Sequence, residues 1–382
     1  MSRLLLAAAL AAQSPAEAPP ELKPFLESCK AAGERLWGHS LCAPVVIVDP
    51  ATGKHRTSQP APPEPLPKMR ANTAIKWGGE DWIMVLAPLP KGAAGLDMLF
   101  HEAWHVRQKS LGYPANASVA GHLDDPTNRY LMRLEWAALE NALKTTGAVQ
   151  RRHVAQALAF RRQRLARKEG AGASEAAQMR HEGMASYTGA RLSGAPVQRA
   201  LEALQGGAKR PSLGRSFAYV NGPAWGLLLD RYRPGWHKAG AAGDLPDLMP
   251  IQAAALARAD DYGGTAVLAE ETLSYVDRER RIRTAMAATT AANGLRLPLR
   301  QMSMDFDPNR VLSGPDGSSL YEKITLSDRW GKIAVNGTPL RMAPDFSAAY
   351  APWPLPEGAL ELGVGWKVEE RSGQPVLVEP GS

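Results

Sequence analysis

His101-Glu102-Ala103-Trp104-His105 is the stretch of this chain that says most about its fold and its chemistry. On an α-helix, residues 101 and 105 lie one turn apart on the same face, so their imidazoles can reach one metal ion. Glu102 can then point at a water in an open coordination position and accept its proton. Gly112 and Pro114 follow, which is typical of a helix end. The stretch predicts a zinc-binding helix, although it also fits a buried helix that carries two histidines and no metal.

Two later segments could complete such a centre. In Arg180-His181-Glu182-Gly183-Met184-Ala185-Ser186-Tyr187, Glu182 offers the third protein ligand that a catalytic zinc ion needs, and the fourth position stays open. Gly183 would let its helix approach the metal helix closely. Tyr219 and Gly222 stand further along, in Phe217-Ala218-Tyr219-Val220-Asn221-Gly222. A tyrosine hydroxyl stays neutral at pH 7 and donates one hydrogen bond, which suits it to stabilising an oxyanion.

Taken in this order, the three segments resemble the zinc aminopeptidases related to aminopeptidase N and leukotriene A4 hydrolase, which are gluzincin metallopeptidases. The E-G-x-A-S-Y pattern is similar to the N-E-G-F-A-x-Y segment of that family, with His181 where the family usually has asparagine. The resemblance implies that His101, His105 and Glu182 hold one Zn²⁺ per chain. It also implies that Glu102 is the general base and that Tyr219 hydrogen-bonds the oxyanion of the tetrahedral intermediate.

The chain departs from that family in two places. Residues 106–181 separate the second histidine from the glutamate, which is about two helices more than the family has. The G-x-M-E-N segment of the exopeptidases is absent, and the strand-like Asp81–Leu86 stands where it would fall. We therefore expect the metal centre without the aminopeptidase specificity, with Asp81–Leu86 aligning an extended peptide by strand addition.

Glu135 is a rival for the third ligand position. It lies on a predicted helix, Pro126–Lys144, within the inserted region. It could replace Glu182 if the fold closed differently, or it could form an ion pair with Arg129 or Arg133. His122 and Asp124 are expected to be loop or capping groups before that helix. His153 and His181 could also bind metal, but lone histidines next to arginine are more often solvated.

The composition is that of an ordinary globular protein of two or three domains, with 382 residues of which 45% are hydrophobic and 22% charged. The net charge of +7 would suit an acidic partner, but no nucleic-acid-binding motif is present, so no nucleic acid is expected. Many of the basic residues share one predicted helix and are expected to form its solvated face: Arg151, Arg152, Arg161, Arg162, Arg164, Arg167 and Lys168.

The N-terminus has the pattern of a secretory signal peptide. Arg3 precedes the short apolar run Leu4–Ala12, and Ala9-Leu10-Ala11 and Ala16-Glu17-Ala18 are cleavage candidates. No later segment reaches about 18 uninterrupted apolar residues, so no integral membrane segment is expected. The mature protein is predicted to be exported, either periplasmic or secreted. In such an oxidising compartment Cys29 and Cys42, the only cysteines, could pair.

The pattern along the chain predicts an α+β protein with a thermolysin-like, gluzincin catalytic core. We expect a helix at Glu21–Leu36, an N-cap at Ser174 and a hairpin turn at Asn336-Gly337. The expected parts are a signal peptide at residues 1–18, an N-terminal β-rich subdomain at 19–96, a mostly helical metallopeptidase lobe at 97–293 and a C-terminal β-domain at 294–382.

The function expected from these features is that of an exported zinc metallopeptidase that acts on a peptide or protein substrate. Two alternatives stay open: a non-catalytic zinc-binding exported protein, and a hydrolase of a non-peptide amide or ester. Glu102 favours catalysis, because a purely structural zinc site does not need a base. The sequence does not indicate an oligomeric state.

Overall fold

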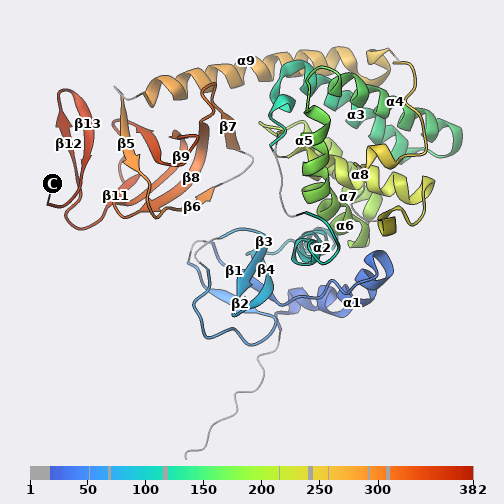
Figure 1. The fold of residues 1–382 in the computed structure, drawn as a ribbon, viewed down its shortest axis with the longest axis horizontal. Coiled ribbons are helices and arrows are strands. Elements are labelled where there is room, and N and C mark those ends of the chain that lie inside the picture. The colour runs from blue at the N-terminus through green and yellow to red at the C-terminus, as the bar shows by residue number, and fades with distance from the viewer. Residues whose placement is uncertain are drawn as a thin grey trace, which may run out of the picture.

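The structure, a computed structural model, describes residues 18–50, 52–67, 70–114, 119–214, 216–239, 244–256, 258–290, 293–306 and 310–381. All but the last residue of the predicted signal peptide, 1–18, lies outside the described residues. The protein is of the α+β type, with a small sheet near the N-terminus, a helical lobe, and a β-domain at the C-terminus (Figure 1).

The N-terminal part combines one helix with a four-stranded sheet. The short helix η1 (Pro20–Leu22) leads into α1 (Lys23–Trp37). The strand order is β2-β1-β4-β3, in which β1 and β4 are parallel and the other pairs antiparallel. The strand bounds are β1 Val45–Val48, β2 His55–Thr57, β3 Thr73–Trp77 and β4 Glu80–Leu86. Every residue of β1, Val-Val-Ile-Val, is buried, which is typical of a strand covered on both faces.

The position of β4 corrects one expectation. The predicted strand Asp81–Leu86 forms most of β4, but β4 lies between β1 and β3 and hydrogen-bonds to both. A strand paired on both sides has no free edge for a peptide. The edge strand on this side is β3, and both β3 and β4 pack against α2 (Ala93–Arg107).

The helical lobe follows α2. Its first long helix runs over Pro126–Lys144, as predicted, because Asp125 caps it by accepting hydrogen bonds from the Thr127 and Asn128 amides. The π-helical turn η3 (Met179–Gly183) links two helices of the lobe. The other elements are η2 Gly121–Asp124, α3 Pro126–Lys144, α4 Gly147–Leu165, α5 Ala171–Gln178, α6 Met184–Leu192, α7 Pro196–Gly207, α8 Phe217–Tyr232, η4 Trp236–Ala239, η5 Pro246–Leu248 and η6 Ala259–Tyr262.

One hydrophobic core joins the N-terminal part to the helical lobe, so the core does not follow the expected boundary near residue 96. Phe25 of α1 packs edge-on against Phe100 of α2, with ring centroids 5.1 Å apart. Trp37 lies beside Trp104 with centroids 6.3 Å apart. All four side chains are buried, and each such burial stabilises the fold by about 1.5–3 kcal/mol. The helix α2 is thereby held from both sides of that boundary.

The β-domain has a core of its own and is joined to the lobe by α9 (Gly264–Ala288), which spans the two in Figure 1. Its main sheet has the order β5-β10-β9-β8-β6, with β7 on β8 and β11 on β9, and β12 and β13 form a separate ribbon. The bounds are β5 Gly294–Pro298, β6 Ser303–Phe306, β7 Val311–Ser313, β8 Ser319–Asp328, β9 Gly331–Met342, β10 Ala348–Pro352, β11 Leu360–Leu362, β12 Lys367–Arg371 and β13 Gln374–Val378.

The predicted hairpin turn at Asn336-Gly337 is wrong. β9 runs straight through both residues, and Asn336 pairs with Lys323 of β8. The pairing shifts register just beyond this point, so Gly337, with φ +88°, belongs to an irregular stretch of a continuous strand. Asparagine and glycine fit a β-bulge as well as a hairpin turn. Here the long-range pairing of β9 with β8 keeps the strand continuous.

Two further local expectations are also wrong. Arg161 and Arg164 of α4 are buried rather than solvated, with Arg164 fully enclosed. Ser174 does not cap a helix: α5 begins after Gly170, and the Ser174 hydroxyl donates to the Ala171 carbonyl.

Two observations bear on the compartment and on membranes. Cys29 and Cys42 form a disulfide, with their Cα atoms 5.0 Å apart. Within the described ranges, none of the helices combines the length and the apolar character that crossing a bilayer requires.

Candidate metal centre

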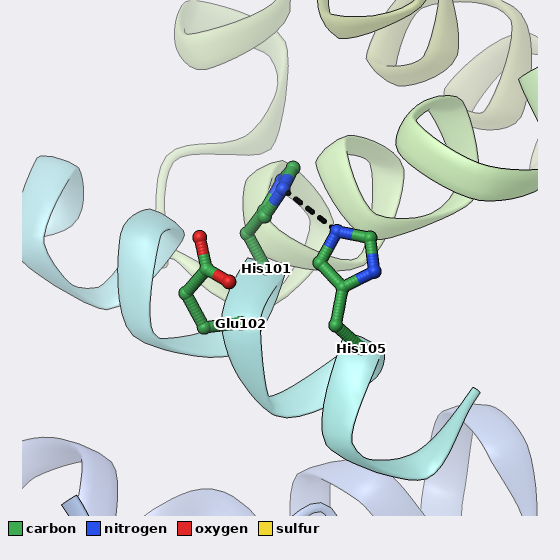
Figure 2. A group of neighbouring side chains, drawn as sticks. All are labelled: His101, Glu102 and His105. Atoms are coloured by element: carbon green, nitrogen blue, oxygen red, sulfur yellow. Dashed lines mark hydrogen bonds between the residues drawn. The ribbon is translucent and has the colours of Figure 1, made fainter. Parts of the chain in front are cut away.

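α2 places the two motif histidines on one side of the helix. Leu99, Phe100, Ala103 and Trp104 are buried in the core, so the face that carries His101 and His105 turns towards α6 and α8. Figure 2 shows the two imidazoles close together, with Glu102 leaving α2 on an adjacent side. The side chains of both histidines keep 13% of their surface exposed. They are therefore held firmly yet remain reachable from solvent.

Glu182 reaches the histidines from the π-helical turn η3. A π-turn adds one residue to a helical turn and is frequent at functional sites. The Glu182 Oε2 atom lies 3.4 Å from His101 Nε2 and 3.3 Å from His105 Nε2. The two Nε2 atoms are themselves 3.2 Å apart. All three residues expected to bind metal are thus brought together, although they come from segments far apart in the sequence.

The three donor atoms form a nearly equilateral triangle of the size that a tetrahedral zinc ion needs. With zinc–ligand bonds of about 2.0–2.1 Å, tetrahedral geometry separates neighbouring donors by about 3.3 Å. The three sides of the observed triangle measure 3.2, 3.3 and 3.4 Å. Three donors leave one tetrahedral position open, as in catalytic sites.

The outer nitrogens of both histidines have partners that leave Nε2 free for a metal. His105 Nδ1 lies 3.0 Å from Gln108 Oε1, which can only accept, so the proton is assigned to Nδ1. His101 Nδ1 lies 3.3 Å from the Ser186 hydroxyl, whose oxygen can accept a hydrogen bond in the same way. Such partners fix the tautomer and orientation of metal-binding histidines. The Nε2 atoms of both histidines then face the carboxylate of Glu182, an arrangement that favours a cation between them, either a proton or a metal ion.

The electrostatics of the centre also favour positive charge. Burial raises the pKa of Glu182, but hydrogen bonds to His101 and His105 outweigh it and hold that pKa below its ordinary value. Burial lowers the pKa of His105, but the carboxylates of Glu182 and Glu102 outweigh it and raise that pKa to about 9. The carboxylate of Glu182 therefore stays charged and stabilises a cation beside it.

Glu102 is suited to act as a base beside the three candidate ligands. Its side chain is buried, with 6% of the residue exposed, and it accepts no hydrogen bond from a described residue. Its carboxylate and the ring nitrogens of His101 and His105 lie within 4.8 Å of one another. Burial raises the pKa of Glu102, partly opposed by the two histidines. A carboxylate with a raised pKa is a stronger proton acceptor.

Tyr219 lies at the centre as the resemblance implies. Its ring stacks on that of His101, with centroids 5.5 Å apart and planes 10° from parallel. Burial raises the pKa of Tyr219, and the negative charges of Glu182 and Glu102 raise it further. The phenol therefore keeps its proton and remains a hydrogen-bond donor. Arg210 lies over the Tyr219 ring, with its guanidinium carbon 5.9 Å from the centroid.

The close approach of the helices depends on a different glycine from the one expected. Gly183 faces Met179 and α8 rather than the metal helix. Gly189 of α6 is the residue in contact with α2, where an added Cβ would lie 2.4 Å from the backbone oxygen of Asp97. Gly189 therefore brings α6, and with it Ser186, against the metal helix.

The residues that surround the candidate ligands were given little weight or were missed in the sequence. His181, expected to be solvated, has 20% of its side chain exposed, and its ring centroid lies 4.7 Å from that of His105. Its Nε2 is 3.5 Å from Glu182 Oε1, and its Nδ1 contacts Gln108. Gln108 also donates to the Pro114 carbonyl. The one signal in the sequence that could have pointed to Gln108 is its spacing, because it stands one helical turn after His105.

Glu135 is not at the centre. It is fully buried and pairs with Arg164 at 2.5 Å, rather than with Arg129 or Arg133 as expected. Its other oxygen accepts hydrogen bonds from the Asn221 amide and the Trp225 indole. With both oxygens in use, Glu135 is a structural residue that holds α8 against α3.

The other candidates also lie elsewhere. His122 pairs with Glu175 at 2.8 Å in the same buried network. Asp124 accepts hydrogen bonds from Ser212 and from the Leu213 amide, and His153 contacts the Tyr262 hydroxyl.

The arrangement can thus hold one divalent cation, take up a proton at Glu102 and donate a hydrogen bond from Tyr219. No family model, curated protein or solved structure matches this chain.

Proposed function

We propose that this protein is an exported zinc metallopeptidase of the gluzincin type, with a thermolysin-like core. The observation that carries the proposal is the donor triangle of His101, His105 and Glu182, with sides of 3.2–3.4 Å. Histidine nitrogens with one carboxylate form a ligand set that zinc takes in hydrolytic enzymes. When bound there, zinc would polarise a substrate carbonyl and make water acidic enough to attack at neutral pH.

The chain's own residues supply the proton transfers. Glu102 takes a proton from the attacking water and later delivers it to the leaving amine. Its burial and raised pKa favour the first step, because a stronger base gains more from accepting the proton. Tyr219 donates a hydrogen bond to the oxygen on which negative charge develops. The stacking of its ring on His101 holds the hydroxyl beside the ligands.

Substrate alignment is assigned to β3. It is the edge strand of the N-terminal sheet on the side that packs against α2, so an extended peptide can add to it. Strand addition binds the peptide backbone and is largely independent of side-chain identity. This supports a peptide or protein substrate over a small non-peptide amide or ester, which presents no strand.

A non-catalytic zinc protein is the alternative that the geometry favours least. Burying a carboxylate disfavours its charged form, and a structural site gains nothing from it. Glu102 bears this cost next to the ligands. Export agrees with the disulfide between Cys29 and Cys42, since such bonds persist in oxidising compartments.

The decisive experiment is metal analysis of the purified mature protein together with cleavage of a peptide library. We expect one zinc per chain and cleavage that a chelator abolishes and added zinc restores. Cleavage of ester or amide model compounds without any peptide cleavage would favour the non-peptide hydrolase. Zinc at full occupancy without hydrolysis of either class would favour the non-catalytic protein.

A further inference from the structure

A second site lies at the opposite end of α8 from the metal centre. A cavity of about 770 Å³ opens between the N-terminal end of α4, the C-terminal end of α8 and the segment at Ile251-Gln252. Tyr232, in its wall, is thirteen residues from Tyr219 on the same helix, or about 20 Å along the axis. The cavity is therefore separate from the chemistry proposed above.

The charged groups that line this cavity are all positive. Arg151 and Arg152 come from α4 and Arg231 from α8, and no described acidic residue is among the lining residues. All three arginines are exposed, and none of them forms an ion pair with a described residue, so their charges are available to a ligand. The Arg151 guanidinium lies over the ring of Tyr232, 5.3 Å from its centroid, which holds it at the cavity wall.

The end of α4 adds positive potential to the same place. A helix N-terminus carries partial positive charge, which acidic residues usually offset. The first turn of α4 holds no acidic residue, and Thr146 at the N-cap makes no side-chain hydrogen bond to it. Gln150, the buried polar residue of the wall, is already engaged: it donates to the Ala142 and Thr145 carbonyls and accepts from Tyr232. These hydrogen bonds fix the wall at Gln150, and no described acidic residue among the lining residues offsets the positive charge.

We propose that this cavity, lined by Arg151, Arg152 and Arg231, binds an organic anion that carries two or more oxyanion groups, phosphate or carboxylate. Guanidinium groups bind such groups through paired hydrogen bonds, and three of them suit a multiply charged ligand. The volume is that of a small-molecule site and exceeds what one inorganic phosphate would fill. A soluble polyanion and the headgroup of an anionic lipid present the same chemistry, and the test separates them.

The test measures binding by the intact mature protein to inorganic pyrophosphate, to citrate, and to phosphatidylcholine vesicles with and without cardiolipin, whose headgroup carries two phosphates. The pocket variant is R151Q/R152Q/R231Q. The matched control, K30Q/R35Q/R283Q, removes the same charge from exposed residues of α1 and α9 that make no ion pair within the described chain. Because all six side chains are exposed, both variants should fold, and thermal melts check this.

We expect the wild type and the control to bind the probes equally, and the pocket variant at least about tenfold more weakly. Binding of pyrophosphate or citrate would identify a soluble ligand, and binding only to anionic vesicles a lipid headgroup. Glu102→Gln should bind as the wild type does, whatever becomes of peptide cleavage. Equal weakening in both triple variants, or binding to none of the probes, would overturn the proposal.

Discussion

Gly222 of α8 and Gly183 of the π-turn meet backbone to backbone: a Cβ added at Gly222 would lie 2.1 Å from the Gly183 carbonyl oxygen and 2.5 Å from its Cα. The glycine of one motif thus packs on the glycine of the other. This contact sets the distance between Glu182, which adjoins Gly183, and Tyr219, one turn before Gly222.

Gly222→Ala should therefore damage the centre without touching any of its functional groups. Both clashing atoms are backbone, so the helices must move apart, which typically costs about 1–3 kcal/mol. We expect a lower melting temperature and weaker zinc binding, measured by thermal denaturation and zinc titration. Gly206→Ala is the matched control, since a Cβ there meets nothing within 4 Å and should leave both unchanged or slightly raise stability.

Replacing each candidate glutamate should separate the ligand from the structural residue. Glu182→Ala should lose most of the bound zinc and keep its fold. Glu135→Ala leaves the buried Arg164 without that partner and should destabilise the protein by about 3–5 kcal/mol. Its folded fraction should still hold zinc, measured by elemental analysis after gel filtration. If Glu135→Ala lost its zinc and Glu182→Ala kept it, Glu135 rather than Glu182 would be the ligand.

Glu102→Gln should keep zinc and lose hydrolysis. The amide has nearly the same shape as the carboxylate but cannot accept a proton at neutral pH. General-base catalysis is worth roughly 10²–10⁴ in rate, and peptide cleavage should fall by about that factor. Full activity in a variant of normal zinc content would remove Glu102 from the mechanism.

Tyr219→Phe should lower turnover without changing metal content. The change deletes one hydroxyl and keeps the ring that stacks on His101. Losing one oxyanion donor costs on the order of 10²–10³ in kcat, with little change in KM. Tyr262→Phe, which removes a hydroxyl that contacts His153 away from the centre, is the control. Reduced stability with unchanged turnover per folded molecule would make Tyr219 a packing residue only.

The buried network around Glu175 predicts a loss of stability in acid. Burial raises the pKa of Glu175, but Arg164 and His122 outweigh it and lower that pKa to about 2. Because this pKa is lower in the folded than in the unfolded state, the stabilisation is present above about pH 4.5. It is lost as the pH falls from about 4.5 to about 2.

Chemical denaturation at several pH values across this range tests whether the free energy of unfolding falls with pH as expected. The wild type should lose stability steadily as the pH falls. Glu175→Gln should be less stable at pH 7 and depend less on pH below 4.5. Parallel pH profiles for the two proteins would mean that other carboxylates dominate acid unfolding.

Local signals predicted much of what the structure has. The helix predicted at Pro126–Lys144 is α3, and its start depends only on local residues, the cap Asp125 and the following Pro126. The spacing of His101 and His105 likewise needs only a helix to bring the rings together. The order of the three motifs, rather than any one of them, pointed to Glu182 and Tyr219 as their neighbours.

The rest could not be predicted because it depends on long-range partners. Arg164 looks like a surface residue in the sequence, and only the carboxylates of Glu135 and Glu175 make its burial tolerable. His181 also lies beside an arginine in the sequence, yet the π-turn that carries Glu182 brings it to the centre. The sequence pattern showed a helix there without revealing the extra residue in its turn.

The length of α9 sets how the β-domain is oriented relative to the helical lobe. Near its start, Glu271 is clamped by Arg129 and Arg133 of α3, and near its end Ala285 packs with Leu312 and Leu320 of the β-domain. Between the two anchors, each residue advances the helix by about 1.5 Å and turns it by about 100°. One inserted residue would swing the β-domain through about a quarter turn with both cores intact. Seven inserted residues would return the β-domain almost to its original orientation, about 10 Å further from the lobe.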